Sequence, residues 1–309
     1  MDMPAIITQM AMLFILLAIG YLAGKVKILT HEGSKILTKV VLFITMPCMI
    51  ISSVVNGNVE GTLGDAMFFI LLTFLAFAIA HVVAIPICRA LGGNKADHGM
   101  YSYVAAYGNV GFMGFPVAYA IFGAESVFYV ALVNMPFVLL AFSIGILMVS
   151  SKGDRITLKF FGKLLLNPSI VAAVIAIVIF ATGVNTPVVI GETVRVMGSM
   201  TTPASMLVIG ASLAQIKVKD VFTDWRLYPV TVIKLAIIPA LVWLVLRQIV
   251  TDDLILGVLV IVSAMPTAAA AAMLAMQYDG NERIASSGTF ITTLLSCATV
   301  PLIVFLLLM

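Results

Sequence analysis

Charged residues are scarce in this chain, and their scarcity excludes most classes of protein. Asp, Glu, Lys and Arg make up 10% of the 309 residues, whereas hydrophobic residues make up 62%. A soluble domain carries about a quarter charged residues. The composition therefore excludes a soluble globular domain and predicts an integral membrane protein.

Cysteine and catalytic motifs are sparse as well. The three cysteines, Cys48, Cys88 and Cys297, lie in or beside apolar stretches and lack the spacing of a metal site or a disulfide framework. The sequence contains no GxSxG elbow, no HExxH pair and no pair of aspartates inside an apolar stretch. We therefore expect no metal, no cofactor and no enzymatic activity.

Long apolar stretches, by contrast, fill the chain. A transmembrane helix needs ~20 predominantly apolar residues, and none of the stretches shows the ~10-residue alternation of a transmembrane β-strand. We predict an all-α membrane protein with ten transmembrane helices. The predicted spans, numbered 1 to 10, are 4–25, 35–56, 66–91, 100–122, 126–150, 165–184, 190–214, 227–250, 254–277 and 284–308.

The few basic residues predict the orientation, because cytoplasmic loops carry an excess of Lys and Arg. Loops after even-numbered spans hold only Arg195 and Arg247, and Lys234 lies inside a span. The loops after odd-numbered spans hold Lys25, Lys27, Lys35, Lys39, Arg89, Lys95, Lys152, Arg155, Lys159, Lys163, Lys217, Lys219, Arg226 and Arg283. We expect a multi-pass protein of the plasma membrane (in bacteria, the inner membrane) with both termini outside. Contact with lipid headgroups explains the basic loops more simply than nucleic acid does.

The start of the chain, MDMPAIITQM, has an acidic residue and no basic residue before its first apolar stretch. A cleaved signal peptide needs a positively charged start, so we expect span 1 to be retained.

The two halves of the chain resemble each other. TMPCMIISS in span 2 and TTPASMLVIGAS in span 7 align Pro47 with Pro203, and the next spans align His81 with Lys234. Five spans are an odd number, so the second copy would cross the membrane inverted. Inverted repeats are typical of secondary transporters. We predict two inverted five-helix repeats, 1–150 and 151–309; chance similarity between proline-containing helices is the alternative.

Span 4 contains GNVGFMGFP, and span 9 contains SAMPTAAAAAM at the matching depth. Gly108 and Asn109 weaken one helix and Pro266 interrupts the other. A break inside a membrane is tolerated only where protein or a wet cavity covers the backbone. Two crossing breaks would present half-helix N-termini, which suit an anion. We predict a substrate site formed by Gly108, Asn109, Met265, Pro266, Thr267 and Ala268. The alternative is that these glycines and alanines pack helices closely.

Only two ionisable residues lie deep in the predicted spans, His81 and Lys234. An intramembrane charge is a functional hypothesis by default, so we expect both to couple transport to an ion or to compensate charge. A neutral histidine bonded to a carbonyl and a lysine holding the carbonyls of a broken helix remain structural alternatives. The absence of deep carboxylates favours an organic anion over a cation as substrate.

Together these motifs resemble the auxin efflux carrier family. The resemblance covers essentially the whole chain, with LLLNPSIVA at 164–172 and KLAIIPALVW at 234–243 as further motifs. It is strongest for the bacterial branch of malate, malonate and other organic-acid permeases. The resemblance implies ten helices in a fold similar to that of bile-acid/sodium symporters. Spans 1, 2, 6 and 7 would form a scaffold, with helix breaks at Pro47 and Pro203, and spans 3–5 and 8–10 a mobile transport domain.

The resemblance also implies roles for individual residues, by their positions in the family's motifs. Asn109 and Pro266 match the asparagine and proline of the family's crossover, whereas Thr267 stands where plant members have an amide. Plant members pair an acid with a lysine in span 3, and this chain has His81 without a nearby acid. The long cytoplasmic loop of many plant members is missing. The resemblance further suggests a homodimer through the scaffold.

We therefore expect a secondary transporter of small organic anions, mainly carboxylates, that works by an elevator-like movement. A sodium-coupled symporter and a ligand-binding membrane sensor are the alternatives. The identity of the acid, the direction of transport and the choice between H⁺ and Na⁺ as coupling ion stay open at this point.

Overall fold

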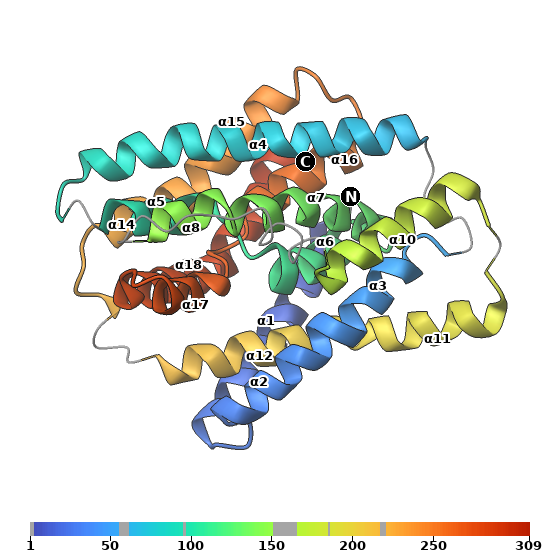
Figure 1. The fold of residues 1–309 in the computed structure, drawn as a ribbon, viewed down its shortest axis with the longest axis horizontal. Coiled ribbons are helices and arrows are strands. Elements are labelled where there is room, and N and C mark those ends of the chain that lie inside the picture. Colours follow the sequence, from blue (N-terminus) through green and yellow to red (C-terminus); the bar gives the residue numbers. More distant parts are fainter. Residues whose placement is uncertain (1–2, 56–61, 95–96, 151–165, 185, 217–220) are drawn as a thin grey trace. The chain divides into compact units, whose positions relative to one another are not determined.

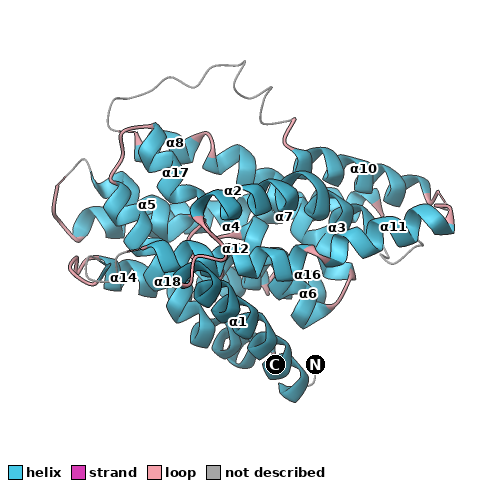
Figure 2. Cartoon of the chain, turned by 90° about the horizontal axis from the view of Figure 1, so that it is seen from below, coloured by secondary structure: helices cyan, strands magenta, loops and turns pink. Residues whose placement is uncertain are grey.

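The computed structural model describes residues 3–309 except 56–61, 95–96, 151–165, 185 and 217–220. Within this described part the chain forms helices and loops, without strands, as Figure 2 shows. Among the described residues, six helical stretches are long and apolar enough to cross a membrane by themselves: Ile7–Lys25, His31–Ser52, Leu63–Ala90, Val188–Gln215, Leu227–Leu246 and Glu282–Leu308. The prediction of an all-α membrane protein is confirmed. The basic residues Lys95, Lys152, Arg155, Lys159, Lys163, Lys217 and Lys219 lie outside the described residues.

Helix occupies every predicted span, although in several of them it is interrupted. The α-helices are α1 (Met3–Lys25), α2 (His31–Val40), α3 (Met46–Ser52), α4 (Leu63–Ala90), α5 (His98–Ala106), α6 (Phe115–Phe122), α7 (Glu125–Ala141), α8 (Ile144–Val149), α10 (Pro168–Thr182), α11 (Val188–Ser199), α12 (Thr201–Gln215), α14 (Leu227–Val232), α15 (Ile238–Leu246), α16 (Asp253–Ser263), α17 (Ala270–Gln277) and α18 (Glu282–Ile303). The π-helical turns are η1 (Val41–Thr45), η3 (Val110–Gly114), η4 (Ile233–Ile237) and η5 (Val304–Leu308). Figure 1 gives their order along the chain.

Three of the π-helical turns end two residues before a proline. Pro47, Pro116 and Pro239 each lie in the first turn of the α-helix that follows η1, η3 or η4. Proline has no N–H to donate to the carbonyl four residues earlier. The chain meets this defect by widening the preceding turn, so that hydrogen bonds span five residues. Pro47, predicted as a helix break, thus marks a π-helical turn in a continuous helix.

Two further spans are interrupted, one of them at the helix break predicted at Pro203 and the other at a place that was not expected. Span 7 divides at Met200 into α11 and α12, because Pro203 cannot donate to the carbonyl of Ser199, the last residue of α11. Span 5 divides between α7 and α8, where the hydroxyl of Ser143 donates to the carbonyl of Leu139. A serine hydroxyl bonded in this way competes with the helix ladder.

The chain divides into two compact units. Unit 1 comprises Met1–Leu71, Gly111–Pro136 and Phe161–Gln215, and unit 2 comprises Leu72–Val110, Phe137–Phe160 and Ile216–Met309. Both units take residues from both halves of the chain.

Unit 1 is organised around the packing of α1 on α12. We call this packing the seam; it is built on Gly20, Gly24 and Gly210. A Cβ atom at Gly210 would lie 2.0 Å from the carbonyl oxygen of Leu17, and one at Gly20 would lie 2.5 Å from that of Leu207. Only glycine permits backbones to approach so closely. On the other side of the unit, α3 packs against α10 and α11.

Unit 2 is organised around α5, which packs against α8, α14 and α18. Residues 100–106 of this helix are all buried. At its start, a Cβ at Gly99 would lie 1.7 Å from the carbonyl oxygen of Met148, which fixes α8 against α5. Further along, Gly288 of α18 lies against Val104. Neighbouring α17 packs on α18.

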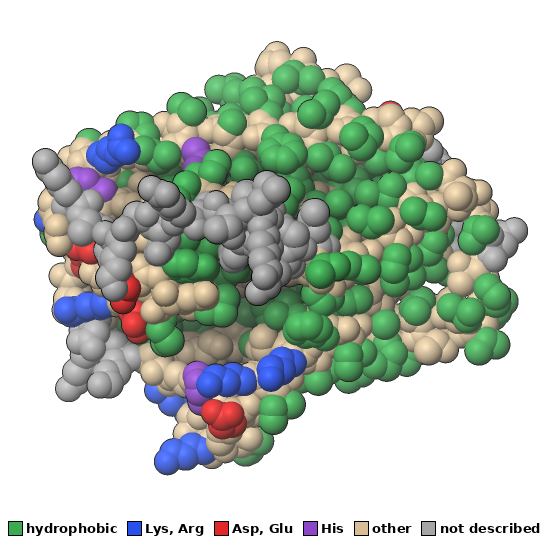
Figure 3. Space-filling view, viewed as in Figure 1, with side chains coloured by type: hydrophobic (Ala, Val, Ile, Leu, Met, Phe, Trp, Pro, Cys, Tyr) green, Lys and Arg blue, Asp and Glu red, His purple; other side chains and the backbone are tan. Residues whose placement is uncertain are grey.

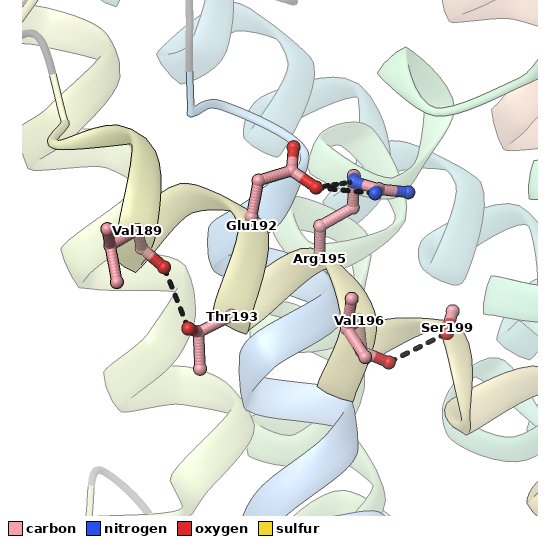
Figure 4. A network of polar contacts seen from close by, with 6 residues as sticks. All are labelled: Val189, Glu192, Thr193, Arg195, Val196 and Ser199. Carbon is pink, nitrogen blue, oxygen red and sulfur yellow. Dashed lines mark hydrogen bonds and ion pairs between the residues drawn. The ribbon is translucent and has the colours of Figure 1, made fainter.

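The surface suits a lipid environment. Figure 3 shows hydrophobic side chains over much of the visible face, with charged groups gathered around α2 and at a few helix ends. Several polar groups on α11 have hydrogen-bond partners within the same helix. On α11 the Nε of Arg195 donates to Glu192 at 2.9 Å, and the hydroxyls of Thr193 and Ser199 donate to carbonyls one turn earlier (Figure 4). Such local hydrogen bonds reduce the cost of placing polar side chains in an apolar helix.

Candidate functional site

The first helix break begins where α5 ends. Tyr107 follows α5 with an extended backbone, φ −101° and ψ 110°, although its N–H still donates to the carbonyl of Tyr103. Gly108 and Asn109 continue without helix, and helix resumes at Val110 as η3. Asn109 is buried, with 5% of its surface exposed. The GNVGFMGFP motif thus interrupts its helix at its first two residues.

The second break lies between α16 and α17. The helix α16 ends at Ser263, and its last hydrogen bonds come from the N–H groups of Ala264 and Met265. Residues 265–268 are non-helical and buried, and α17 starts at Ala270. Pro266 provides the interruption, because it has no N–H for the helix ladder.

The two breaks are hydrogen-bonded to each other. Gly108 and Thr267 form an isolated antiparallel bridge. The N–H of Asn109 donates to the carbonyl of Pro266 at 2.7 Å, and the N–H of Ala268 donates to the carbonyl of Tyr107 at 3.0 Å. We call residues 107–110 and 264–269, all in unit 2, the crossing. Each break supplies the backbone partners that the other has lost.

The side chains of Thr267 and Thr292 form hydrogen bonds with further backbone groups at the two breaks. The hydroxyl of Thr267 donates at 2.9 Å to the carbonyl of Val104, a group in the last turn of α5. The N–H of Thr267 donates to the hydroxyl of Thr292 at 3.1 Å, and this hydroxyl lies 2.7 Å from the carbonyl of Gly288. Thr267 is completely buried. Its side chain therefore holds the crossing together.

Lys234 lies at the carboxyl end of α16. Its Nζ donates to the carbonyl of Ser263 at 3.1 Å, and only 1% of its surface is exposed. A Cβ placed on Gly108 would lie 3.1 Å from this Nζ and 3.2 Å from the carbonyl oxygens of Val262 and Met265. The amine thus fills the space beside Gly108. The carboxyl end of a helix carries a partial negative charge, which favours a cationic group.

The amide end of the second break is different. Ala269, the N-cap of α17, is exposed and cannot cap the helix with its side chain. The N–H groups in the first turn of a helix have no partner within that helix. At the crossing, the carbonyls of Val104, Tyr107, Ser263 and Pro266 accept hydrogen bonds from other parts of unit 2, whereas the amide end of α17 has no side-chain cap. This asymmetry favours a negatively charged ligand.

A second polar cluster joins α4 to the crossing. The Nδ1 of His81 lies 2.6 Å from the carbonyl oxygen of Phe77, and its Nε2 lies 2.9 Å from the hydroxyl of Tyr107. That hydroxyl is also placed to donate to the carbonyl of Leu140 at 2.9 Å. The half-buried imidazole meets the Tyr107 ring edge-on. His81 is therefore connected to the crossing through a residue that belongs to it.

Comparison with known proteins identifies the family. A family described as "Membrane transport protein" matches residues 5–304 of the chain. The chain belongs to this family. The resemblance to auxin efflux carriers noted above is thereby confirmed.

Relatives from three organisms cover nearly the full length of the chain. An "Uncharacterized transporter" of Methanothermobacter thermautotrophicus is 23% identical over 93% of this chain and 94% of its own, and an uncharacterized transporter of Methanocaldococcus jannaschii is 26% identical over the same shares. A "Putative malonate transporter" of Rhizobium meliloti is 23% identical over 95% of this chain and 93% of its own. The protein is thus a multi-pass membrane protein of a transporter family.

The structure brings most of the predicted site residues together in this family member. Gly108, Asn109, Met265, Pro266, Thr267 and Ala268 form the crossing, with Lys234 beside Gly108 and His81 joined through Tyr107. Pro47 and Pro203 lie in unit 1 and take no part in it. Sequence reasoning missed Tyr107 and Thr292. In the sequence, Thr292 is recognisable only as one of two adjacent threonines in an apolar span. Such a pair does not indicate that Thr267 is its hydrogen-bond partner.

Proposed function

We propose that this protein is a secondary transporter of small organic anions, with carboxylates as its substrates, and that the anion binds at the crossing. The observation that carries the proposal is the asymmetry of the hydrogen bonds there. The carbonyls of Val104, Tyr107, Ser263 and Pro266 have donors within unit 2. The amide end of α17 has no side-chain cap and begins at the exposed Ala269, although the N–H of Ala271 donates to the carbonyl of Ala268. A carboxylate would accept hydrogen bonds from such amides and gain from the helix dipole.

Two further points support this substrate class. The Rhizobium meliloti relative is named for malonate, a small dicarboxylate. Among the described residues of unit 2, the helices carry carboxylates only in their first turns, at Asp253 of α16 and Glu282 of α18. An anion therefore meets no buried negative charge from these helices.

We propose that the site is opened to each side of the membrane in turn, as in other transporters built from two inverted repeats. We propose ten spans in two inverted five-helix repeats, 1–150 and 151–309, with spans 3–5 and 8–10 moving as an elevator against spans 1, 2, 6 and 7. Unit 1 contains spans 1, 2, 6 and 7, and unit 2 contains spans 8–10 with most of span 3. Spans 4 and 5 are divided between the units, after Val110 and after Pro136. The site then moves with the unit that contains it.

Sodium coupling through backbone carbonyls is less well supported. A sodium ion at the breaks would need carbonyl oxygens as ligands. Those of Tyr107 and Pro266 accept N–H groups, and those of Val104 and Ser263 accept side-chain donors. A membrane sensor on the same fold would bind the anion without carrying it.

Malonate counterflow in proteoliposomes tests the function. Vesicles loaded with unlabelled malonate should accumulate external radiolabelled malonate, whereas the neutral diamide of malonate should not compete. A panel of mono- and dicarboxylates would rank the substrates. If the folded protein exchanges none of these anions, the proposed function is wrong; binding without exchange would indicate a sensor.

Asn109→Leu tests the location of the site. The leucine keeps the apolar span and the backbone bond to Pro266 but removes the one polar side chain at the first break. We expect normal insertion and at least a ~10-fold loss of counterflow, equivalent to ~1.4 kcal/mol, within the range of one hydrogen bond to a charged group. Met273→Leu, at an exposed position of α17, is the control. Equal counterflow in the two variants would place the substrate elsewhere.

The proposed orientation has both termini outside the cell. In a variant without native cysteines, Thr251→Cys in the loop after α15 should react with an impermeant maleimide added outside. Asp279→Cys in the loop after α17 should not react. Both positions are exposed. The opposite labelling pattern would reverse the orientation.

A further inference from the structure

The cluster formed by His81, Tyr107 and Leu140 has three hydrogen-bond contacts, but a neutral histidine and the tyrosine hydroxyl together supply only two hydrogens for them. Three contacts exist: Nδ1 of His81 with the carbonyl of Phe77, Nε2 with the hydroxyl of Tyr107, and this hydroxyl with the carbonyl of Leu140. A carbonyl can only accept, so the Nδ1 of His81 must carry a hydrogen. That assignment leaves Nε2 as an acceptor in the neutral ring.

The tyrosine hydroxyl has a single hydrogen. If it is donated to Nε2, the carbonyl of Leu140 loses this donor; if it is donated to Leu140, two acceptors face each other 2.9 Å apart. One added proton on Nε2 resolves the conflict. The ring then donates to Phe77 and to Tyr107, and Tyr107 donates to Leu140. Only the protonated histidine makes all three hydrogen bonds.

Leu140 is suited to gain and lose this donor. It lies at the end of α7, just before the interruption that precedes α8, and the N–H of Ser143 also approaches its carbonyl, at 3.3 Å. The carbonyl therefore keeps a partner when Tyr107 turns towards His81. With neutral His81, the hydroxyl of Tyr107 can donate to His81 of α4. With protonated His81, the same hydroxyl accepts from His81 and donates to Leu140, so that α7 is also connected to the cluster.

Tyr107 connects this exchange to the substrate site. Its side chain lies in the cluster, and its backbone carbonyl accepts the N–H of Ala268 across the crossing. The titratable groups around the cluster are Tyr103, whose ring lies 4.7 Å from that of Tyr107, and Lys234 beside Gly108. On α4 itself the others are Asp65 in the first turn, and Cys88 and Arg89 near the end. The carboxylates of α7, α16 and α18 likewise lie in the first turns of those helices.

We propose that His81 is the proton-binding group of this carrier, with Tyr107 and the carbonyl of Leu140 completing its site, so that the organic anion moves together with a proton. The proton comes from solution, adds to Nε2 and leaves from the same atom, and no other bond forms or breaks. The added positive charge lies beside Tyr107, a residue of the crossing, and it favours the binding of an anion there. This proposal rests on the proposed transport function.

Nitrogen NMR of histidine tests the site without any transport. The chain has three histidines, and His81→Gln identifies the signals of His81. With ¹⁵N-histidine in detergent, we expect His81 to carry its hydrogen on Nδ1 when neutral and to become doubly protonated within ~pH 5–8, the range in which histidine titrates. Tyr107→Phe should alter this titration and leave His31 and His98 unchanged. An Nε2–H tautomer, or a His81 titration indifferent to Tyr107→Phe, would overturn the proposal.

Proton movement in proteoliposomes tests the coupling. A pH dye inside the vesicles and radiolabelled malonate together give the number of protons carried per malonate. We expect this ratio to fall to zero in His81→Gln and to decrease in Tyr107→Phe, with His98→Gln, a histidine at the start of α5, as control.

The outcomes separate the two proposals. Malonate counterflow without proton movement in the unmodified protein would refute proton coupling and leave the transport function intact. Absence of counterflow would refute the transport function, and the NMR titration would then still decide whether His81 and Tyr107 form a proton site. A His81→Gln variant that carries malonate with the unmodified proton ratio would refute the role of His81.

Discussion

The seam of unit 1 and the crossing of unit 2 both depend on glycine, but for different reasons. In the seam, α1 and α12 are uninterrupted helices, and a Cβ on Gly210 would lie 2.0 Å from a backbone oxygen of α1. At the crossing, both helices are broken, and the nearest atom to a Cβ on Gly108 would be the Nζ of Lys234 at 3.1 Å. At Gly210 of the seam, a side chain would collide with the backbone of α1. At Gly108 of the crossing, a side chain would instead meet the amine of Lys234.

This difference separates a structural glycine from a functional one. Backbone contact along two continuous helices is how membrane helices associate, and it has no need of buried polar groups. The crossing contains a buried asparagine and a buried threonine besides its glycine, and the buried Lys234 and Thr292 contact it. Polar groups in a membrane are costly unless they are paired, so their concentration here supports our proposal that the crossing is a site rather than a packing contact.

The largest effect is expected at the seam. Gly210→Ala would force α1 and α12 apart, because the obstructing atoms are backbone atoms that cannot rotate away. Overpacking of this type costs ~1–3 kcal/mol and occasionally more, and we expect the upper end. The measurement is the thermal unfolding midpoint and the yield of monodisperse protein in detergent.

Gly33→Ala on α2 is the matched control, because its Cβ would meet nothing closer than 3.4 Å. Alanine also has a higher helix propensity than glycine, so this variant should be at least as stable as the unmodified protein. A Gly210→Ala protein as stable as Gly33→Ala would show that the helices can separate freely, and the contrast between seam and crossing would disappear.

Lys234→Met should give the next largest effect, and mainly on function. Methionine retains the apolar stem, but the carbonyl of Ser263 loses its donor and the carboxyl end of α16 loses its cation. An unsatisfied buried acceptor costs ~1–3 kcal/mol, and removal of a desolvated charge offsets part of that cost in overall stability. We expect malonate binding to weaken by ~10-fold or more with a smaller change in unfolding temperature.

Val232→Met, an exposed position two residues before Lys234, is the control for this substitution. Malonate binding by titration calorimetry and thermal unfolding should be measured on both variants. Unchanged binding in Lys234→Met would assign the lysine to structure alone and weaken the electropositive description of the site.

Gly108→Ala gives the direct comparison with Gly210→Ala. Its Cβ would lie 3.1–3.2 Å from an amine and two carbonyl oxygens, and the flexible lysine can yield by a few tenths of an ångström. We therefore expect a stable protein whose malonate counterflow is reduced several-fold, because the amine is displaced from the carboxyl end of α16. Loss of folding as severe as in Gly210→Ala would mean that Gly108 is a packing glycine after all.

The breaks could be predicted from sequence because their causes are local. Gly108 with Asn109, and Pro266, weaken a helix wherever they occur, and both helices end at these places. The interruption between α7 and α8 was missed, because one serine hydroxyl bonding back to a carbonyl leaves no pattern in the sequence. The break at Met200 was predicted from Pro203, and it lies three residues before that proline.

The partners across the crossing could not be predicted for a related reason. Thr267 and Thr292 are separated by 25 residues, and His81 and Tyr107 by 26. Helical periodicity says which residues share a face of one helix, but not which carbonyl of another helix a hydroxyl will meet. Lys234 was singled out as a buried ionisable residue, and a lysine holding the carbonyls of a broken helix was one of the two interpretations. The structure shows this contact, with the amine on the carbonyl of Ser263.

The smallest effect is expected for Thr267→Val, which keeps the shape of the side chain and removes its hydroxyl. The carbonyl of Val104 then loses its donor, while the N–H of Thr267 keeps its bond to Thr292 because that bond comes from the backbone. A single neutral hydrogen bond contributes ~1 kcal/mol net, so we expect the crossing to remain folded and counterflow to fall by ~5-fold. Thr267→Ser keeps the hydroxyl and is the control; it should retain most of the counterflow. Thr292→Val removes the next hydroxyl in the same chain of bonds, and because the two groups are in contact, the double variant should lose less than the sum of the single losses. Additive losses would instead mean that the two threonines act separately, and that the crossing is held by its backbone hydrogen bonds alone.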